Sequence, residues 1–397
     1  MEQVSRRISE LSTSETLAMS ARSAELRARG IDVINLSVGE PDFYTPEHIK
    51  RAAEQAIDNN YSFYSPVAGF LELRQAICEK LKRENQLDFS PAQIVVSNGA
   101  KQSVCNVLMS VVGSNDEVII PSPFWVSYPE MVKLAEATPV FVPANIESDF
   151  KISPAQLEAA ITPKTRAIIL CSPSNPTGSV YSQSELAALA RVLENHPNII
   201  IISDEIYEHI NYTGEHQSIA QFEKLRARTV IINGVSKGYA MTGWRIGWLA
   251  APKWIADACN KLQGQFTSGA CSIAQKAAQA AYEGDQTCVR EMQQAFERRR
   301  DLVVNLANKI DGLKVNRPQG AFYIFPECKF FFGKSLNGRK INNASDLAMY
   351  LLDEANVACV AGDAFGAAEC IRMSYATSDD KLTEAFARIK TALGKLK

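Results

Sequence analysis

One lysine and one arginine, eight positions apart, are the first residues in this sequence whose types and spacing suggest chemistry. Lys237 lies among small residues and follows the β-branched run 229–232, which predicts a buried strand. Small and apolar neighbours desolvate an ammonium group and lower its pKa. A neutral lysine amine can form a Schiff base with a carbonyl. Arg245 can hold a phosphate, and a ligand with both a carbonyl and a phosphate is pyridoxal phosphate (PLP).

Polar residues also follow two other predicted strands, at the points where those strands end. Asn175 comes after the apolar run 167–170, and Asp204 comes after the run 198–202. Both runs are apolar on both faces and are separated by helical stretches, which is typical of parallel strands covered by helices. In such sheets, ligands bind outside the carboxyl ends of the strands. We therefore expect Asn175, Asp204 and Lys237 to converge on one crevice.

Charge and hydrogen-bonding capacity indicate what these side chains can do around a pyridine ring. A carboxylate at Asp204 can hold a proton on the ring nitrogen, while Asn175 and Tyr207 can hydrogen-bond a phenolate oxygen. Trp125 follows the predicted strand 117–120 and can stack on a flat heterocycle. Taken alone, an aspartate after a buried strand is a helix N-cap about as often as a ligand.

The order of these signals resembles the class I/II aminotransferases of fold type I. Residues 236–247 match the family's cofactor-lysine signature, Ser-Lys-x-x-x-Met-x-Gly-x-Arg-x-Gly. The family motifs Asn-Pro-x-Gly and Asp-x-x-Tyr begin at Asn175 and Asp204. The resemblance implies PLP as cofactor and a ping-pong Schiff-base mechanism, in which Lys237 also moves the proton as general acid and base. It assigns Lys237, Asp204 and Tyr207 as the catalytic residues.

The resemblance also implies how the cofactor phosphate is held. Strand 94–97, a glycine turn and a helix follow one another, which is an arrangement that favours anion binding at the helix N-terminus. Tyr64 resembles the family tyrosine that reaches the phosphate of the neighbouring subunit, which implies a homodimer with shared active sites. The expected cofactor-binding residues are Gly99, Ala100, Lys101, Trp125, Asn175, Asp204, Tyr207, Ser236, Lys237, Arg245 and Tyr64.

Two further positions resemble the family's site for the substrate α-carboxylate. Gly39 follows the predicted strand 32–37, and the family places this glycine beside the carboxylate. Arg372 lies within the apolar strand 371–375, where an arginine needs a partner, and a carboxylate is its best match. Trp125 and Asn175 are expected to contact the substrate as well.

Within the family, the chain is most similar to the bacterial-type aspartate aminotransferases. The shared features are Ser14, Thr16, the segment Gly39–Asp42, Lys101 and Tyr128-Pro129-Glu130. In that subgroup the lysine and the N-terminal hydroxyls receive the side-chain carboxylate of the substrate. Lys101 is also a cation that a phosphate-binding turn does not need, since backbone N–H groups suffice there.

The expected reaction is transfer of the amino group of aspartate (or glutamate) to 2-oxoglutarate (or oxaloacetate). The alternatives on the same fold are transamination of prephenate, aromatic amino acids or alanine, and a β-lyase activity. A transcription regulator with an aminotransferase-like module would need a DNA-binding domain. The sequence ahead of the first cofactor motif shows no basic excess that would suit one.

Length and pattern predict two domains in an α/β fold. The 397 residues exceed the size, about 250–300 residues, at which single cores stop growing. We expect the PLP-transferase fold type I, with a mostly parallel central sheet covered by helices in a large domain and a smaller α+β domain. The predicted boundaries are 48–288 for the large PLP-binding domain, and 1–47 with 289–397 for the small domain.

Composition argues against several classes of partner. The net charge of −2 gives no reason to expect nucleic acid or an anionic membrane, and no metal site is predicted. Nine cysteines without a CxxC pair suggest reduced thiols in the cytoplasm. The first residues lead into no apolar signal segment, and no apolar run is long enough to span a membrane.

Two helices carry local predictions. In the stretch 12–30, Ser12 and Glu15 fit a capping box, and Gly30 fits a C-terminal stop. The charged stretch 288–310 predicts a solvated helix joining the domains, whose arginines carry no function.

Overall fold

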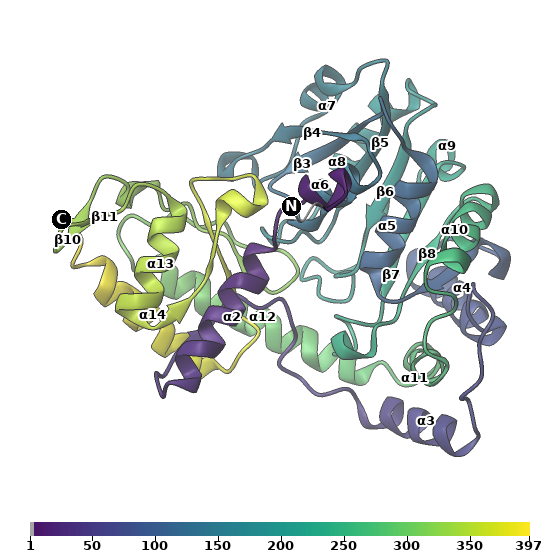
Figure 1. Ribbon diagram of the computed structural model, residues 1–397, viewed down its shortest axis with the longest axis horizontal. Helices are drawn as coiled ribbons and strands as arrows, with labels where there is room; N and C mark the ends of the chain where they lie inside the picture. Colours follow the sequence, from purple (N-terminus) through teal and green to yellow (C-terminus); the bar gives the residue numbers. More distant parts are fainter. Residues whose placement is uncertain (1–3) are drawn as a thin grey trace.

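A seven-stranded sheet forms the centre of the computed structural model, which describes residues 4–397 (Figure 1). The strand order is β2-β8-β7-β6-β5-β3-β4. Its strands are β2 (Ile94–Ser97), β3 (Glu117–Ser122), β4 (Thr138–Pro143), β5 (Thr165–Cys171), β6 (Ile200–Asp204), β7 (Thr229–Gly234) and β8 (Gly247–Ala250). All neighbouring pairs are parallel except those of β8, which runs antiparallel to β2 and β7. The prediction of a mostly parallel sheet is confirmed.

Helices cover both faces of this sheet. Ile169 and Ile202 belong to one apolar cluster, while their chain neighbours Ile168 and Ile201 belong to another on the opposite face. This alternation explains why the strands read as continuous apolar runs. The first cluster includes α5 (Ala100–Val111), α6 (Ser127–Leu134) and α10 (Lys253–Phe266). The second cluster and a neighbouring one include α7 (Pro154–Ala160), α8 (Gln183–Glu194), α9 (Glu223–Arg226), α3 (Glu47–Asp58), α4 (Leu71–Asn85) and α11 (Ser272–Glu283).

A smaller domain lies beside the sheet and is drawn in green to yellow in Figure 1, with the purple helix α2 against it. Its core gathers a three-stranded antiparallel sheet, β13-β14-β9, and a two-stranded parallel sheet, β1-β12. The strands are β1 (Ile34–Asn35), β9 (Tyr323–Ile324), β12 (Val357–Ala358), β13 (Val360–Ala361) and β14 (Ile371–Ser374), with the hairpin β10 (Ser335–Leu336) and β11 (Arg339–Lys340). The helices are α2 (Glu15–Ala28), α12 (Thr287–Ala307), α13 (Ala344–Ala355) and α14 (Asp379–Leu393). The domain boundaries near residues 47 and 288 stay a prediction.

No helix in the part of the chain from residue 4 onward is long and apolar enough to cross a membrane.

The N-terminal helix starts later than its sequence pattern predicts. Helix α2 begins at Glu15 with Ser14 as N-cap, and the Ser14 side chain makes no capping hydrogen bond. The predicted capping box at Ser12 is wrong, because Ser12 instead donates its backbone N–H to Oε2 of Glu130 on α6, at 2.8 Å. A tertiary contact replaces the local cap. Gly30 does follow the helix end, with a left-handed φ of 84°.

Two arginines of the connecting helix α12 are buried, so the prediction of a solvated face is wrong for them. Arg299 is 8% exposed and Arg300 is 3% exposed. Arg299 donates to Asp42 at 2.7 Å, and Arg300 donates to the carbonyl of Pro318 at 3.0 Å. Arg300 also pairs with Glu297 and Asp301 inside the charge run, but Asp42 and Pro318 lie outside it, so the charge run by itself does not reveal the burial. Arg298 faces solvent as predicted.

A buried ion pair fixes the turn after β6 to the helix layer. The ammonium of Lys80 on α4 is fully buried, contacts the carboxylate of Glu208, and donates to Oδ1 of Asn85 at 2.7 Å. Glu208 also accepts hydrogen bonds from Asn85 at 2.9 Å and Asn233 at 2.8 Å. Burial alone would raise the pKa of Glu208, but the Lys80 charge holds this pKa well below its usual range. Glu208 follows β6 and Asn233 belongs to β7, so this network connects the ends of two strands that carry site residues.

Replacement of Lys80 by methionine should lower the free energy of unfolding by ~3–5 kcal/mol, because it leaves the Glu208 carboxylate buried without its counter-ion. Denaturant unfolding of the variant measures this loss. The matched control is Lys253→Met, which removes an exposed ion pair to Asp257 and should cost less than about 1 kcal/mol. Equal losses in the two variants would contradict the importance of the buried pair.

Candidate active site

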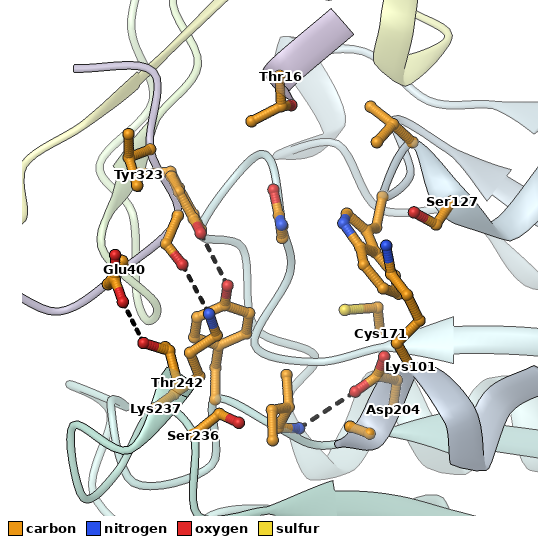
Figure 2. Close-up of a pocket in the computed structure, with 18 of the residues that line it drawn as sticks. Thr16, Glu40, Lys101, Ser127, Cys171, Asp204, Ser236, Lys237, Thr242 and Tyr323 are labelled. Atoms are coloured by element: carbon orange, nitrogen blue, oxygen red, sulfur yellow. Dashed lines mark hydrogen bonds between the residues drawn. The ribbon is translucent and has the colours of Figure 1, made fainter. Parts of the chain in front are cut away.

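A cavity of about 400 Å³ lies at the carboxyl ends of β5, β6 and β7, between the two domains (Figure 2). Most of the predicted site residues line it, and they come from segments that are far apart in the chain. These residues are Ser14, Thr16, Gly39, Ala100, Lys101, Trp125, Asn175, Asp204, Tyr207, Ser236, Lys237, Arg245 and Arg372. The expected convergence of Asn175, Asp204 and Lys237 on one crevice is therefore what the fold produces. Gly99 and Tyr64 do not line this cavity.

Lys237 follows β7 and extends into the cavity. Its ammonium donates to the carbonyl of Gly39 at 2.6 Å. Burial lowers the pKa of Lys237 to about 8, while the nearby Glu40 carboxylate opposes this shift and Arg372 adds to it. A lysine with this pKa has a substantial neutral fraction near neutral pH, so the amine can act as nucleophile and as acid or base.

Asp204 is the last residue of β6 and is buried below the cavity. Its Oδ2 accepts a hydrogen bond from the hydroxyl of Tyr128 at 2.7 Å, and Oδ1 accepts one from the backbone N–H of Ile206 at 3.3 Å. Burial raises the pKa of Asp204 to about 6, and the bond from Tyr128 limits the rise. The carboxylate is ionised at neutral pH, and no cation among residues 4–397 is in direct contact with it, which suits it to hold a protonated ring nitrogen.

Tyr207 and Tyr323 form a hydroxyl pair at the wall of the cavity. The two phenol oxygens are 2.8 Å apart (Figure 2). Burial raises the pKa of both side chains, so both phenols are protonated at neutral pH. Neither Tyr323 nor Tyr128 was predicted as a site residue. The sequence gives only a weak signal for them, since an aromatic in a short apolar strand or at a helix start is usually a packing residue.

Arg372 lies on β14 and is buried. It donates to Oδ1 of Asn175 at 2.9 Å and to the carbonyl of Ser37 at 2.6 Å. Its Nε is buried without a hydrogen-bond partner, and no carboxylate pairs with its guanidinium among residues 4–397. A buried cation with an unused N–H is costly unless a ligand completes it. The site therefore fits an incoming carboxylate.

The turn between β2 and α5 and the side chain of Arg245 form a candidate phosphate site. Arg245 has a left-handed φ of 57° and donates to the carbonyls of Thr242 at 2.9 Å and Asn98 at 3.3 Å. A Cβ at Gly99 would lie 2.3 Å from the guanidinium, so only glycine allows this approach. The N–H of Gly99 donates to the carbonyl of Ser97 at 2.8 Å, and the expected role of Gly99 in binding the cofactor stays a prediction. The free N–H groups of the first helical turn begin at Ala100.

The outer part of the cavity holds a cation and two hydroxyl residues. The ammonium of Lys101 lies 4.9 Å from the ring centre of Trp125, and Lys101 has no carboxylate partner in the described chain. Partial burial and repulsion by Arg245 lower the pKa of Lys101. Ser14, the N-cap of α2, and Thr16 in its first turn also line the cavity, and Figure 2 shows Thr16 on that helix. This group can receive a second anionic end of a ligand.

Tyr64 lies outside the cavity and is 99% exposed, and its neighbour Phe63 is 82% exposed. No contact among the described residues brings Tyr64 to the site. The position of this residue is therefore consistent with a role in another subunit, and that role stays a prediction.

Comparisons with known proteins agree with the geometry. The family model described as aminotransferase class I and II matches residues 31–389. The aspartate/prephenate aminotransferase of Nitrosomonas europaea is 48% identical over 394 residues, covering 98% of this chain and 99% of that protein. The aspartate aminotransferase of Bacillus subtilis is 46% identical over 394 residues, covering 99% of each.

Solved structures match over the same length. The crystal structure of the aspartate aminotransferase from Rhizobium meliloti has a TM-score of 0.97 and 44% identity, with all of both chains covered. The Thermus thermophilus aspartate aminotransferase with maleate has a TM-score of 0.93 and 40% identity, covering 99% of this chain and 100% of that one. With its fold, its lysine site and these matches in agreement, the chain belongs to the class I and II aminotransferases, a family that uses PLP.

Proposed function

We propose that this protein transfers the amino group of aspartate (or glutamate) to 2-oxoglutarate (or oxaloacetate), with PLP as its cofactor. The observation that carries the proposal is the meeting of three groups in one cavity: the Lys237 amine with its lowered pKa, the buried Asp204 carboxylate, and the incompletely bonded Arg372 guanidinium. The names of the relatives above support the choice of substrate.

The residues present fit PLP. Lys237 would hold the aldehyde, Asp204 would hold the pyridine nitrogen, and Trp125 would stack on the ring. Asn175 and Tyr207 would hydrogen-bond the phenolic oxygen. The phosphate would be held by backbone N–H groups of Ala100 and Lys101 together with Ser236 and Arg245. When bound, PLP supplies an electron sink for the substrate Cα–H bond.

The chain's own residues supply binding and proton transfer. Arg372 binds the α-carboxylate and orients the substrate. Lys237 moves the proton at the substrate Cα, because its pKa of about 8 lets it hold or release a proton near neutral pH. Asp204 stays ionised and retains the proton on the ring nitrogen. Because donor and acceptor use the same cavity, the first product must leave before the second substrate binds, which gives ping-pong kinetics.

Lys101, Ser14 and Thr16 would receive the distal carboxylate of the substrate. Lys101 is the cation of the outer cavity, and a charge-assisted hydrogen bond to it favours dicarboxylates. Prephenate also carries a second carboxylate, and the Nitrosomonas europaea relative is named for both activities. Transamination of prephenate is therefore the second candidate, ahead of aromatic amino acids and alanine.

We also propose a cytoplasmic location. All nine cysteines lack a disulfide partner. This pattern suits a compartment that keeps thiols reduced.

Lys237→Ala should abolish turnover and leave the protein folded. It should also remove the visible absorption band that arises in the wild type when PLP binds covalently to Lys237. In the cofactor-free wild type, the rate at which this band forms should rise with pH through about 8, because only the neutral Lys237 amine attacks the carbonyl. Absorbance after mixing with PLP measures both effects. Near-native turnover of the variant would remove the central assignment.

Lys101→Ala should lower kcat/KM for aspartate and glutamate by roughly 10–150-fold, which corresponds to one charge-assisted hydrogen bond. Alanine lacks the second carboxylate, so its kcat/KM should change little. Steady-state kinetics with aspartate and alanine on both proteins separate this role from phosphate binding. An equal loss for the two amino acids would show that Lys101 serves the cofactor instead.

We propose that the protein is a homodimer with shared active sites, in which Tyr64 reaches the phosphate of the other subunit. The supporting observation is a set of large side chains that a single chain leaves in solvent, including Tyr44, Phe63, Tyr64 and Phe266. Such exposed aromatics are typical of an interface.

Mixing inactive Lys237→Ala subunits with Tyr64→Phe subunits tests the shared site. A heterodimer gathers both lesions in one site and leaves the other site intact, so activity should exceed the sum of the two parents. Native mass spectrometry verifies subunit exchange. If heterodimers form without a gain in activity, Tyr64 serves its own chain.

A further inference from the structure

Tyr323 is a cavity residue whose contacts are not explained by packing alone. It lies on β9, is fully buried, and contributes to the cavity from the small domain. Its hydroxyl contacts the Tyr207 hydroxyl at 2.8 Å, and its ring centre lies 4.6 Å from Cζ of Arg372. One side chain therefore touches both the residue proposed for the phenolic oxygen of PLP and the residue proposed for the substrate carboxylate.

The space around the Tyr323 hydroxyl is restricted. A Cβ at Gly39 would lie 2.5 Å from the Tyr323 oxygen, so the backbone of the Gly39 turn passes directly against it. The same turn supplies the carbonyl that accepts from Lys237. Gly39, Tyr323 and Tyr207 therefore line the cavity as neighbours, with Gly39 in contact with both Lys237 and Tyr323.

The hydroxyl hydrogens of Tyr207 and Tyr323 determine what the pair can bind. Within residues 4–397, each of the two hydroxyls has only the other as hydrogen-bond partner. One hydrogen lies between the oxygens, so one hydroxyl hydrogen is left for a third group. If Tyr323 donates to Tyr207, the Tyr207 hydrogen is free to point at a ligand. Donation to Tyr207 also polarises its O–H bond and strengthens the bond that Tyr207 makes in turn.

A second tyrosine pair in this protein, Tyr212 and Tyr375, uses its hydroxyl hydrogens differently. The hydroxyls of Tyr212 and Tyr375 are 3.2 Å apart, and both donate to the carbonyl of Ala321. Their hydrogens are thus used within the protein, and neither residue lines the cavity. In the Tyr207–Tyr323 pair, one hydroxyl hydrogen has no acceptor among residues 4–397 and can bond to a ligand.

We propose that Tyr323 is a positioning residue for the proposed transamination: its hydroxyl fixes the donor direction of Tyr207, while its ring holds the guanidinium of Arg372. The inference rests on the proposed function. The two contacts link the carboxylate-binding group to the group that tunes the cofactor through one side chain of the small domain. The Phe365 ring, 4.8 Å from Cζ of Arg372, and the bonds to Asn175 and Ser37 hold the guanidinium as well.

The test compares Tyr323→Phe with the control Tyr375→Phe in PLP-loaded protein. Hydrogen-bond donation to the phenolic oxygen disfavours the protonated form of the bound chromophore. Tyr323→Phe weakens this donation and should raise the pH midpoint of the visible band by roughly half a pH unit. Its kcat should fall roughly two- to tenfold, with KM for aspartate unchanged, because the ring against Arg372 remains. Tyr375→Phe should leave the midpoint and kcat at wild-type values.

Tyr323→Leu removes the ring as well as the hydroxyl. It should raise KM for aspartate roughly two- to thirtyfold, which is the loss expected for one cation–π contact. The split between kcat in Tyr323→Phe and KM in Tyr323→Leu separates the two contacts. If Tyr323→Phe and Tyr375→Phe have similar thermal unfolding midpoints, the shift of the pH midpoint in Tyr323→Phe comes from the site. If the pH midpoint shifts only in proportion to the stability that each variant loses, the inference is overturned.

A double-mutant cycle gives the decisive result. In a Tyr207→Phe background, adding Tyr323→Phe should produce no further shift of the pH midpoint, since the hydroxyl acts through Tyr207. Additive shifts, or a Tyr323→Phe titration that coincides with that of Tyr375→Phe, would overturn the inference while leaving the proposed function in place. Failure of the proposed function is a different outcome: wild-type protein would then form no visible band that depends on Lys237.

Discussion

The buried guanidinium of Arg372 is the constraint on which the rest of the site depends. It sits in β14 of the small domain, yet it donates to Asn175 after β5 of the large sheet and to Ser37 in the segment after β1. Desolvating this charge is costly, and these hydrogen bonds offset only part of the cost. Arg372 therefore holds three segments together and keeps an N–H free for a carboxylate. Through these bonds the residue contacts both domains.

Two other ionisable groups at the site, Asp204 and Lys237, are buried, and burial disfavours the charged form of each. Burial raises the pKa of Asp204 to about 6 and lowers that of Lys237 to about 8. A raised carboxylate pKa means that ionised Asp204 destabilises the fold, fully so above about pH 6. A lowered lysine pKa means that protonated Lys237 destabilises the fold below about pH 8, and this cost disappears as the pH rises towards the unfolded-state value. Between these values both costs apply, in the range where the proposed chemistry needs both groups.

Sequence reasoning located the residues that follow strands, because the carboxyl ends of parallel strands meet at one edge. Asn175, Asp204 and Lys237 could be placed together on that ground alone. Tyr128 and Tyr323 could not, because an aromatic on a helix or in a short strand gives the same pattern whether it packs or donates a hydrogen bond. The charge run does not predict the burial of Arg299 and Arg300 for a related reason: two of their acceptors, Asp42 and the Pro318 carbonyl, lie outside the run and are brought in by the tertiary fold.

The same limit explains the N-terminal segment. Its local pattern favours a cap at Ser12, but the Ser12 N–H is bound by Glu130 of the large domain, and the helix starts three residues beyond Ser12, at Glu15. Helix α2 then packs against β12 and β13 of the small domain. The short link from Ser12 to Ser14 thus crosses from one domain to the other at the mouth of the cavity, where Ser14 and Thr16 line it. Any ligand that bonds to these hydroxyls also bonds to the connection between the domains, so recognition of a distal carboxylate and the relative position of the two domains are physically coupled.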